Sequence, residues 1–269
     1  MEEWIQTREE FLLPVSYFHV VFTIPDNLNW LCLFKPKEVY DILFKTAWSV
    51  INSFGHDKKW LGAQVGMIAI LHTWGQTVNL HTHLHCQIPG GGLTKNGRWT
   101  ISKSKNKYMF SVKAINKVFR VRFIDELKIK IPDLLTQDLI NQLYNKEWVV
   151  YAKPPFGSVH SVIEYLGRYS HKVAISYHRL QDISGGKVSF SYKNYKEQGK
   201  KKTMTLDAIE FVRRFSMHIL PREFVRIRHY GILAFSPILQ TISYPNTKTG
   251  QNLCFRSNFS KMTVLQRAG

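Results

Sequence analysis

The pattern of hydrophobic and polar positions predicts two neighbouring strands between residues 64 and 92. Residues 64–74 (QVGMIAILHTW) form an apolar run, and in residues 79–92 (NLHTHLHCQIPGGG) histidines alternate with small or apolar side chains. The GQTVN segment at their junction predicts a turn, so we expect the two strands to form an antiparallel hairpin. A proline and three glycines then end the second strand and leave the backbone free to turn.

The rest of the chain predicts further strands and helices. Runs of β-branched and aromatic residues predict strands at residues 16–24, 147–152, 173–177, 187–192 and 224–234. Apolar residues at helical spacing predict helices at residues 37–54, 111–130, 133–145, 158–171 and 206–219. The polar residues 93–107 predict a loop or a short hairpin, the KEQGKKK segment at 196–202 predicts a second loop, and residues from 236 onward predict a poorly packed tail.

Three histidines of the second hairpin strand occupy every second position, at His81, His83 and His85. Alternate side chains of a strand point to the same face, so the three imidazoles form one row while Leu84 and Cys86 point into a core. Structural histidines are the simpler alternative, but each buried imidazole would need a hydrogen-bond partner. The row therefore indicates a metal site that still lacks a ligand.

The register of the hairpin decides which residue completes this site. If paired residue numbers sum to an odd value, His72 lies on the face of His83 and His85. An even sum would present Leu71 and Thr73 instead, and neither side chain suits a metal. We therefore expect His72 to be the third ligand. Two alternatives stay open, Gln76 and His81.

Charge indicates the class of partner. The 37 lysines and arginines outnumber the 19 aspartates and glutamates, which gives a net charge of +18. Such a surface attracts polyanions, and nucleic acid is favoured over an anionic membrane because no basic amphipathic anchor is evident. No apolar window of about 18 residues predicts a membrane span. The acidic start of the chain does not resemble a signal peptide.

Two tyrosines stand one helical turn apart in the segment EYLGRYSHK. Tyr165 and Tyr169 are four positions apart, so on a helix their side chains are neighbours. They are either an aromatic core stripe or a pair of reactive hydroxyls, and the polar neighbours Arg168, His171 and Lys172 favour the second reading. Because the ordinary pKa of tyrosine is about 10, a tyrosine nucleophile needs a nearby cation or a metal-polarised electrophile. A metal held by the histidine row would meet that need.

With both constellations in place, the chain resembles the HUH (His–hydrophobic–His) single-stranded DNA endonucleases, and specifically the two-tyrosine rolling-circle transposases of bacterial insertion sequences. The resemblance extends from about residue 4 to residue 235, and the histidine motif precedes the tyrosines as it does in transposases and replication initiators. The motifs that carry it are YFHVVFTIP, LHTWGQ, HTHLHCQIPGGG, YLGRYSHKVAISYHRL and FVRRFSMHILPREFVRIRHYGIL.

The resemblance implies roles for individual residues. His83 and His85 match the metal-binding His–hydrophobic–His step, and Tyr165 and Tyr169 match the two nucleophilic tyrosines. It implies Mg²⁺ or Mn²⁺ as the cofactor and single-stranded or hairpin DNA at transposon ends and target as the partner. The reaction it implies is nicking and rejoining of DNA through a covalent 5′-phosphotyrosine. A bacterial cytoplasmic, nucleoid-associated protein is expected.

The resemblance also implies an α+β fold, with a central antiparallel sheet that carries the histidine hairpin. Helices cover the sheet, and the tyrosine helix lies across the metal. We expect one endonuclease domain at residues 1–235, with a mostly helical insertion at about 93–146, and a tail at 236–269. Members of this family commonly begin with a cysteine-rich zinc-binding domain, and the chain's three cysteines are too few and too scattered for one.

Basic and aromatic residues outside the two motifs are candidates for DNA contacts. Arg168 and Lys172 would steer a phosphate or lower a tyrosine pKa, although both also fit a solvated helix face. The other candidates for contacts with the DNA backbone are Lys200, Lys201, Arg226 and Arg228, and those for base stacking are Trp74 and Trp99. Two other functions remain open, a plasmid or phage replication initiator and a DNA-binding protein without catalytic activity.

Overall fold

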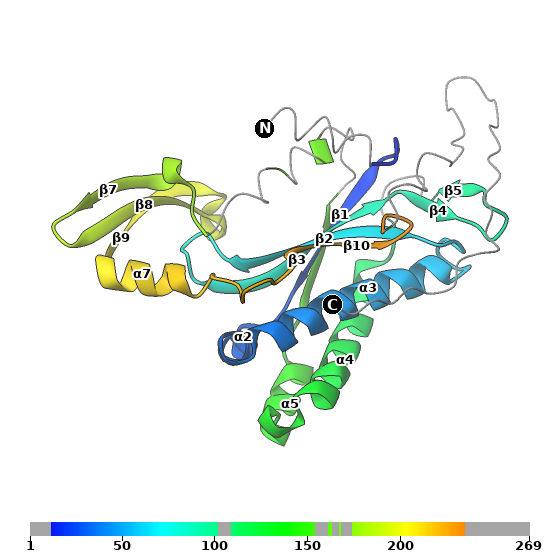
Figure 1. Cartoon of the computed structure of the whole chain (residues 1–269), viewed down its shortest axis with the longest axis horizontal. Helices are drawn as coiled ribbons and strands as arrows, with labels where there is room; N and C mark the ends of the chain where they lie inside the picture. The colour runs from blue at the N-terminus through cyan, green and yellow to red at the C-terminus, as the bar shows by residue number, and fades with distance from the viewer. Residues whose placement is uncertain (1–11, 102–108, 154–160, 163–166, 168–173, 235–269) are drawn as a thin grey trace.

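The computed structural model describes residues 12–101, 109–153, 161–162, 167 and 174–234 (Figure 1). Within these ranges the chain combines helices with antiparallel sheets, which confirms the α+β class. The expected tail at 236–269 and most of the expected helix at 158–171 lie outside the described residues. No helix among the described residues is long and apolar enough to cross a membrane.

A five-stranded sheet forms the centre of the described structure, and every strand pairing in it is antiparallel. The strands lie in the order β10 (Ile227–Gly231), β2 (Gly66–Trp74), β3 (Leu80–Pro89), β1 (Tyr17–Thr23) and β6 (Val149–Lys153). The expected hairpin is confirmed as β2 and β3, and it has a strand on each side. Its histidines are therefore held in the interior of the sheet.

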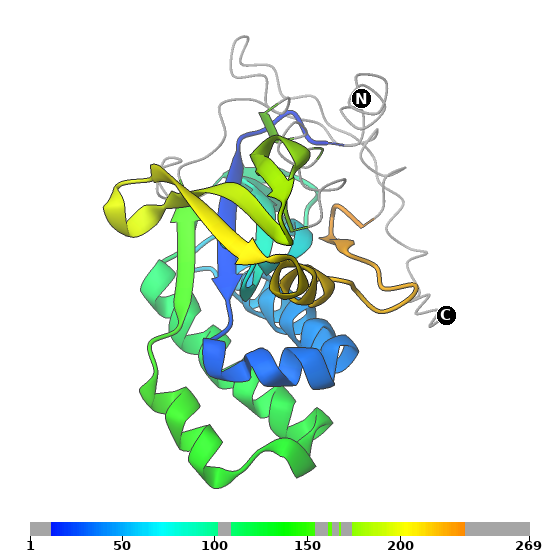
Figure 2. The ribbon, with the colours of Figure 1, turned by 90° about the vertical axis from the view of Figure 1, so that its left-hand side faces the viewer.

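Helices cover one face of this sheet. Figures 1 and 2 show α3 (Pro36–His56), α4 (Val112–Lys130) and α5 (Gln137–Asn145) on the same side. Alternate residues of β1, such as Val20 and Phe22, join the buried side chains of α3 and α4 in one apolar core. Because side chains alternate across a strand, the residues between them project from the opposite face of the sheet, which is the face that carries the histidine row.

The helices begin where local capping allows. The N-cap of α4 is Ser111, whose side chain accepts a hydrogen bond from the backbone N–H of Ala114. The expected helix at 133–145 is shorter than predicted: a 3-10 turn occupies Pro132–Leu134, and α5 starts only after Thr136. The Thr136 hydroxyl accepts the N–H of Leu139, so this residue caps the helix rather than continuing an earlier one.

A smaller three-stranded sheet lies beside the central one. It contains β7 (Leu180–Ser184), β8 (Lys187–Asn194) and β9 (Lys200–Asp207), and α7 (Ala208–Ser216) covers one of its faces (Figure 1). Phe190 of β8 packs there against Phe211 of α7. Around residues 91–101 the expected loop or hairpin is a short hairpin, formed by β4 (Gly91–Leu93) and β5 (Trp99–Ile101).

Three predictions around the smaller sheet were wrong in detail. Residues 174–177 form no strand, because Ala174 has a positive φ of 51° and the chain then enters a 3-10 turn at Tyr177–Arg179. Residues 200–202 of the expected loop are part of β9, and α7 begins at Ala208 rather than at 206. Local composition was misleading here because pairing with the preceding strand β8 makes lysine-rich residues part of a strand.

Helix α7 and the residues just after it hold the turn between β2 and β3. The His218 ring donates Nε2–H to the carbonyl of Val78 at 3.0 Å, and Arg214 donates to the carbonyl of Thr77 at 3.3 Å. Val78 has a φ of 59°, which a β-branched residue rarely adopts, and it is fully buried against Phe190 and Ala174. Contacts from a distant part of the chain thus stabilise a strained turn and, through it, the hairpin that carries the histidines.

Candidate metal centre

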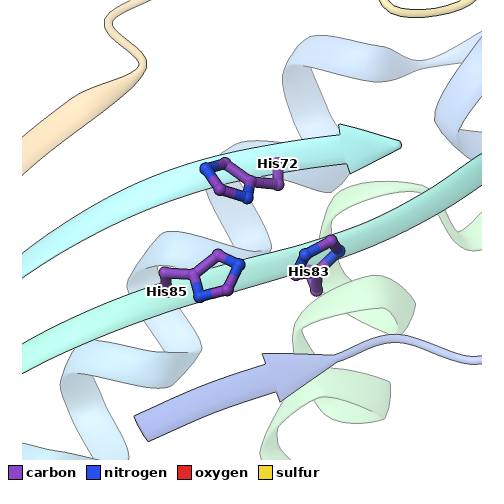
Figure 3. A group of neighbouring side chains, drawn as sticks. All are labelled: His72, His83 and His85. Atoms are coloured by element: carbon purple, nitrogen blue, oxygen red, sulfur yellow. The ribbon is translucent and has the colours of Figure 1, made fainter. Parts of the chain in front are cut away.

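Three imidazoles converge on the face of the central sheet opposite α3 and α4. His72 of β2 is directly opposite His83 of β3, and His85 follows two positions later on the same face (Figure 3). One nitrogen of each ring can be chosen so that all three lie within 4.8 Å of one another. The paired numbers sum to an odd value, as expected, while Leu71 points into the core on the other side.

The two alternatives for the third metal ligand, Gln76 and His81, lie elsewhere. Gln76 accepts a hydrogen bond from the backbone N–H of Lys193 at 3.2 Å, which holds its side chain against the smaller sheet. The His81 side chain is exposed at the start of the row, and it is not part of the group of ligand atoms found among the described residues. His72 is therefore the candidate that the structure brings to His83 and His85.

A backbone contact sets the protonation of His83. Its Nδ1 lies 2.6 Å from the carbonyl oxygen of His81. A carbonyl can only accept a hydrogen bond, so Nδ1 carries the proton of the neutral ring and Nε2 keeps its lone pair. That nitrogen is then available to a metal ion.

Burial keeps the cluster neutral. It lowers the pKa of His83 to about 4, and the neighbouring His81 contributes in the same direction. The pKa of His72 lies well below the usual 6.5, first because of burial and then because of the charges of His83 and Arg226. Burial and the adjacent imidazoles also lower the pKa of His85. Three neutral imidazoles within one ion's reach are a donor set that fits a divalent metal.

The sequence analysis missed a fourth histidine at this site. His19 of β1 is 3% exposed, and its Nε2 lies 2.8 Å from Nδ1 of His85. The two ring planes are nearly parallel, with centroids 5.0 Å apart and an angle of 17° between planes. Burial lowers the pKa of His19 to about 4. A histidine within the apolar strand YFHVVFT was the available signal, but its relation to His85 depends on the β1–β3 register.

An aromatic and a basic side chain border the cluster. The Trp74 ring stacks on His72 with centroids 5.0 Å apart, and the guanidinium carbon of Arg226 lies 4.8 Å from the Trp74 centroid. Arg226 also donates Nε–H to the carbonyl of Leu71 at 3.1 Å. Trp99 packs over Gly91, where any side chain would meet the indole at 2.7 Å. Both tryptophans expected to stack on bases are thus engaged within the protein.

The other basic candidates have different surroundings. Arg228 forms an ion pair with Asp41, and its guanidinium carbon lies 4.2 Å from the Phe44 centroid, so it fastens β10 to α3 on the helix-covered face. Lys200 and Lys201 are exposed on β9. These two lysines are accessible to a polyanion, whereas Arg228 already has an acidic partner.

The predicted tyrosine segment is described only in part. Tyr165, Arg168, Tyr169 and Lys172 lie outside the described residues. Ser161, Val162 and Gly167, which belong to the same predicted helix, have helical backbone conformation.

Val162 relates this segment to the histidine face. It is fully buried in an apolar cluster with Ile68 and Ile70 of β2. Ile70 pairs with His85, so this part of the predicted helix packs on the face that carries the histidines.

Comparison with known proteins gives consistent matches. Residues 66–239 match the model of a family described as "Putative transposase". The "Putative transposase y4qJ" of Sinorhizobium fredii (strain NBRC 101917 / NGR234) is 38% identical over 246 residues, which cover 86% of this chain and 62% of that protein. The "Transposase for insertion sequence element IS801" of Pseudomonas savastanoi pv. phaseolicola is 27% identical over 248 residues, which cover 87% of this chain and 58% of the relative. The chain thus spans less than two thirds of either relative's length.

Proposed function

We propose a function from the family to which the chain belongs, the one described as "Putative transposase", whose model matches residues 66–239. In this proposal the chain cuts and rejoins single-stranded DNA with a tyrosine nucleophile beside a histidine-bound metal ion. The observation that carries the proposal is the pairing of His72 with His83, which gathers three neutral imidazoles on one face of the sheet. Two structural histidines in a sheet would not need a third from the neighbouring strand.

In this proposal His72, His83 and His85 hold the metal. The chemistry that bound Mn²⁺ or Mg²⁺ supplies is polarisation of a phosphate and stabilisation of the charge that develops on its oxygens. Nitrogen ligands suit Mn²⁺ better than Mg²⁺, which prefers oxygen. The protein's own part is to keep the three rings neutral and correctly oriented.

The proposed nucleophiles are Tyr165 and Tyr169. They follow Val162 by three and seven positions, the spacing of one helix face, and Val162 packs beside Ile70 on the histidine side. In the proposed step the tyrosine oxygen bonds to phosphorus and the bond from phosphorus to the 3′ oxygen breaks. The 3′ oxygen takes up the proton that tyrosine loses. The product is a 5′-phosphotyrosine and a free 3′ hydroxyl, and reversal of the step rejoins a strand.

The net charge of +18 supports a DNA substrate held through its phosphates. Exposed Lys200 and Lys201 are the proposed contacts on β9, and Arg226 lies close to the metal centre. We further propose that the nick serves rolling-circle-type transposition at the ends of an insertion sequence, since both relatives are named transposases. A replication initiator would make the same nick at an origin instead.

A covalent-adduct assay tests the proposal. Both strands of the DNA that flanks the encoding gene are tiled as 3′-labelled single-stranded oligonucleotides and incubated with the protein and MnCl₂. We expect a protease-sensitive, slower band on a denaturing gel with a subset of the oligonucleotides. The control is the double variant Tyr165→Phe/Tyr169→Phe, which should form no adduct. Absence of adduct with every oligonucleotide, or adduct with the double variant, would contradict the proposal.

A further inference from the structure

His19 has no part in the metal site as proposed, yet it is buried against one of the ligands. It projects from β1 onto the histidine face, where Val21 of the same strand is opposite His85. Its Nε2 lies 2.8 Å from His85 Nδ1, which is a hydrogen-bond distance. Figure 3 shows one nitrogen of the His85 ring turned towards His72 and His83 and the other turned towards β1.

A single proton must lie between these two nitrogens, and its location decides whether His85 can bind a metal. A neutral imidazole carries one proton. If that proton is on Nδ1 of His85, Nδ1 donates to His19 and Nε2 keeps a lone pair that faces the cluster. If His19 donates instead, the His85 proton must be on Nε2, and the nitrogen that faces His72 and His83 cannot bind a metal. The direction of this hydrogen bond thus decides whether Nε2 of His85 keeps the lone pair that can bind a metal.

His83, the other proposed ligand on β3, gives a direct comparison for the tautomer of His85. His83 Nδ1 lies 2.6 Å from the carbonyl of His81, an acceptor that leaves only one tautomer possible. His85 occupies the equivalent position two residues later, and its Nδ1 faces a side chain rather than a carbonyl. A metal that binds both rings through Nε2 requires the same tautomer in each.

We propose that His19 is a positioning residue that accepts the Nδ1–H of His85. The Nε2 of His85 is then unprotonated, and its lone pair faces His72 and His83. The inference rests on the proposed metal site. It assigns His19 the Nδ1–H tautomer, which leaves its Nε2 as the acceptor. The planes of the two rings differ by only 17°, so the two nitrogens face each other edge to edge, as a hydrogen bond between them requires. Partners of this kind change metal affinity by about 10- to 100-fold in other proteins when they are removed.

The first test measures Mn²⁺ affinity by titration calorimetry. His19→Phe keeps a ring but removes the acceptor, and we expect it to weaken Mn²⁺ binding by about 10- to 100-fold. His19→Gln offers a carbonyl oxygen near the position of Nε2 and should recover most of the affinity. Val21→Ala is the matched control, because Val21 is directly opposite His85 but makes no hydrogen bond to the ring. It should bind nearly as well as the wild type. Unchanged or tighter binding by His19→Phe would overturn the proposal.

The second test needs no substitution and so does not depend on a variant that folds. In ¹⁵N-labelled wild-type protein, the long-range ¹H–¹⁵N correlations of the His85 ring distinguish a protonated Nδ1 from a protonated Nε2. We expect the proton on Nδ1 of His85 and on Nδ1 of His19. A proton on Nε2 of His85 would refute the assignment.

The two proposals fail in different ways. If the wild type binds no Mn²⁺ at all, the metal site itself is wrong and the role of His19 falls with it. If the wild type binds Mn²⁺ and forms the DNA adduct while His19→Phe binds equally well, only the role of His19 is wrong.

Discussion

His72 on β2 lies directly opposite His83 on β3, and this pairing places imidazoles from two strands on one face of the sheet. A slip of one residue would turn His72 into the helix-packed core and bring an apolar or hydroxyl side chain to the metal centre. Arg214 of α7 and His218 just after that helix oppose such a slip by holding the turn between the two strands. Correct assembly of the proposed site therefore depends on residues more than 100 positions away in the sequence.

The histidine cluster should be essential for cleavage. We expect His83→Ala and His85→Ala each to reduce the rate of adduct formation about 100-fold or more, because several kcal/mol of charge stabilisation would be lost. EDTA should have the same effect on the wild type. His81→Ala is a matched control, since the side chain is exposed while the backbone carbonyl that bonds His83 remains. A quantitative adduct assay measures all four, and wild-type rates in the first two variants would refute the metal assignment.

The two tyrosines should have separable roles. One tyrosine can hold one 5′ phosphate, so a second cut made while the first link persists needs a second tyrosine. We expect Tyr165→Phe and Tyr169→Phe each to retain some adduct but to lose strand transfer. Mass spectrometry of the trapped adduct identifies the residue that carries DNA. Full strand transfer in one of the single variants would instead make that tyrosine a structural residue.

The protein should prefer single-stranded or hairpin DNA over plain duplex, because a flexible strand can bend to bring its phosphate to the metal. Equal cleavage of an oligonucleotide and of its annealed duplex would argue against this preference. Binding of either form should weaken steeply as salt rises.

Lys201 and Arg228 should differ in what they contribute. Lys201→Gln should lower DNA affinity and reduce the slope of log affinity against log salt by about 1, because the lysine is exposed and available to phosphate. Arg228→Gln should instead lower the free energy of unfolding by about 1.5–3 kcal/mol, because it removes the ion pair with Asp41 and the contact with Phe44. Fluorescence anisotropy at several salt concentrations and urea denaturation measure the two effects. A large salt-slope change in Arg228→Gln would show that this arginine contacts DNA after all.

His218, which holds the turn between β2 and β3, should make the stability of the protein depend on pH. Burial lowers the pKa of His218 below its usual 6.5, while its Nε2–H bonds Val78 and its Nδ1 accepts from the Thr73 hydroxyl. In the unfolded chain His218 takes up a proton below about pH 6.5, whereas the folded state resists it, so this contribution to stability is present above pH 6.5 and declines as the pH falls.

His218→Asn isolates this contribution. We expect it to cost about 1–3 kcal/mol at pH 7.5 and clearly less at pH 5.5. Urea denaturation of both proteins at the two pH values gives the difference. A gap that stays constant or widens at pH 5.5 would contradict the assignment of a neutral, buried His218.

Several features of the fold follow from local sequence alone. The period of two in residues 79–89 and the helical period in 37–54 were confirmed as β3 and α3, because such periods reflect which face of a single element is buried. Elsewhere the same reasoning failed. The expected strand at 173–177 is absent from residues 174–177, and β7 was not foreseen, since its exposed and polar residues form a strand only by pairing with β8.

What the sequence by itself determined is the row of His83 and His85, the net charge and the limited choice of registers, since each of these depends only on neighbouring positions or on composition. The tertiary structure decided the rest. It selected the register that brings His72 to the row, placed His19 beside His85, and turned Arg228 towards Asp41. These outcomes depend on which strands pair and which face the helices cover. Both are set by burial of apolar surface across the whole chain, which no local pattern contains.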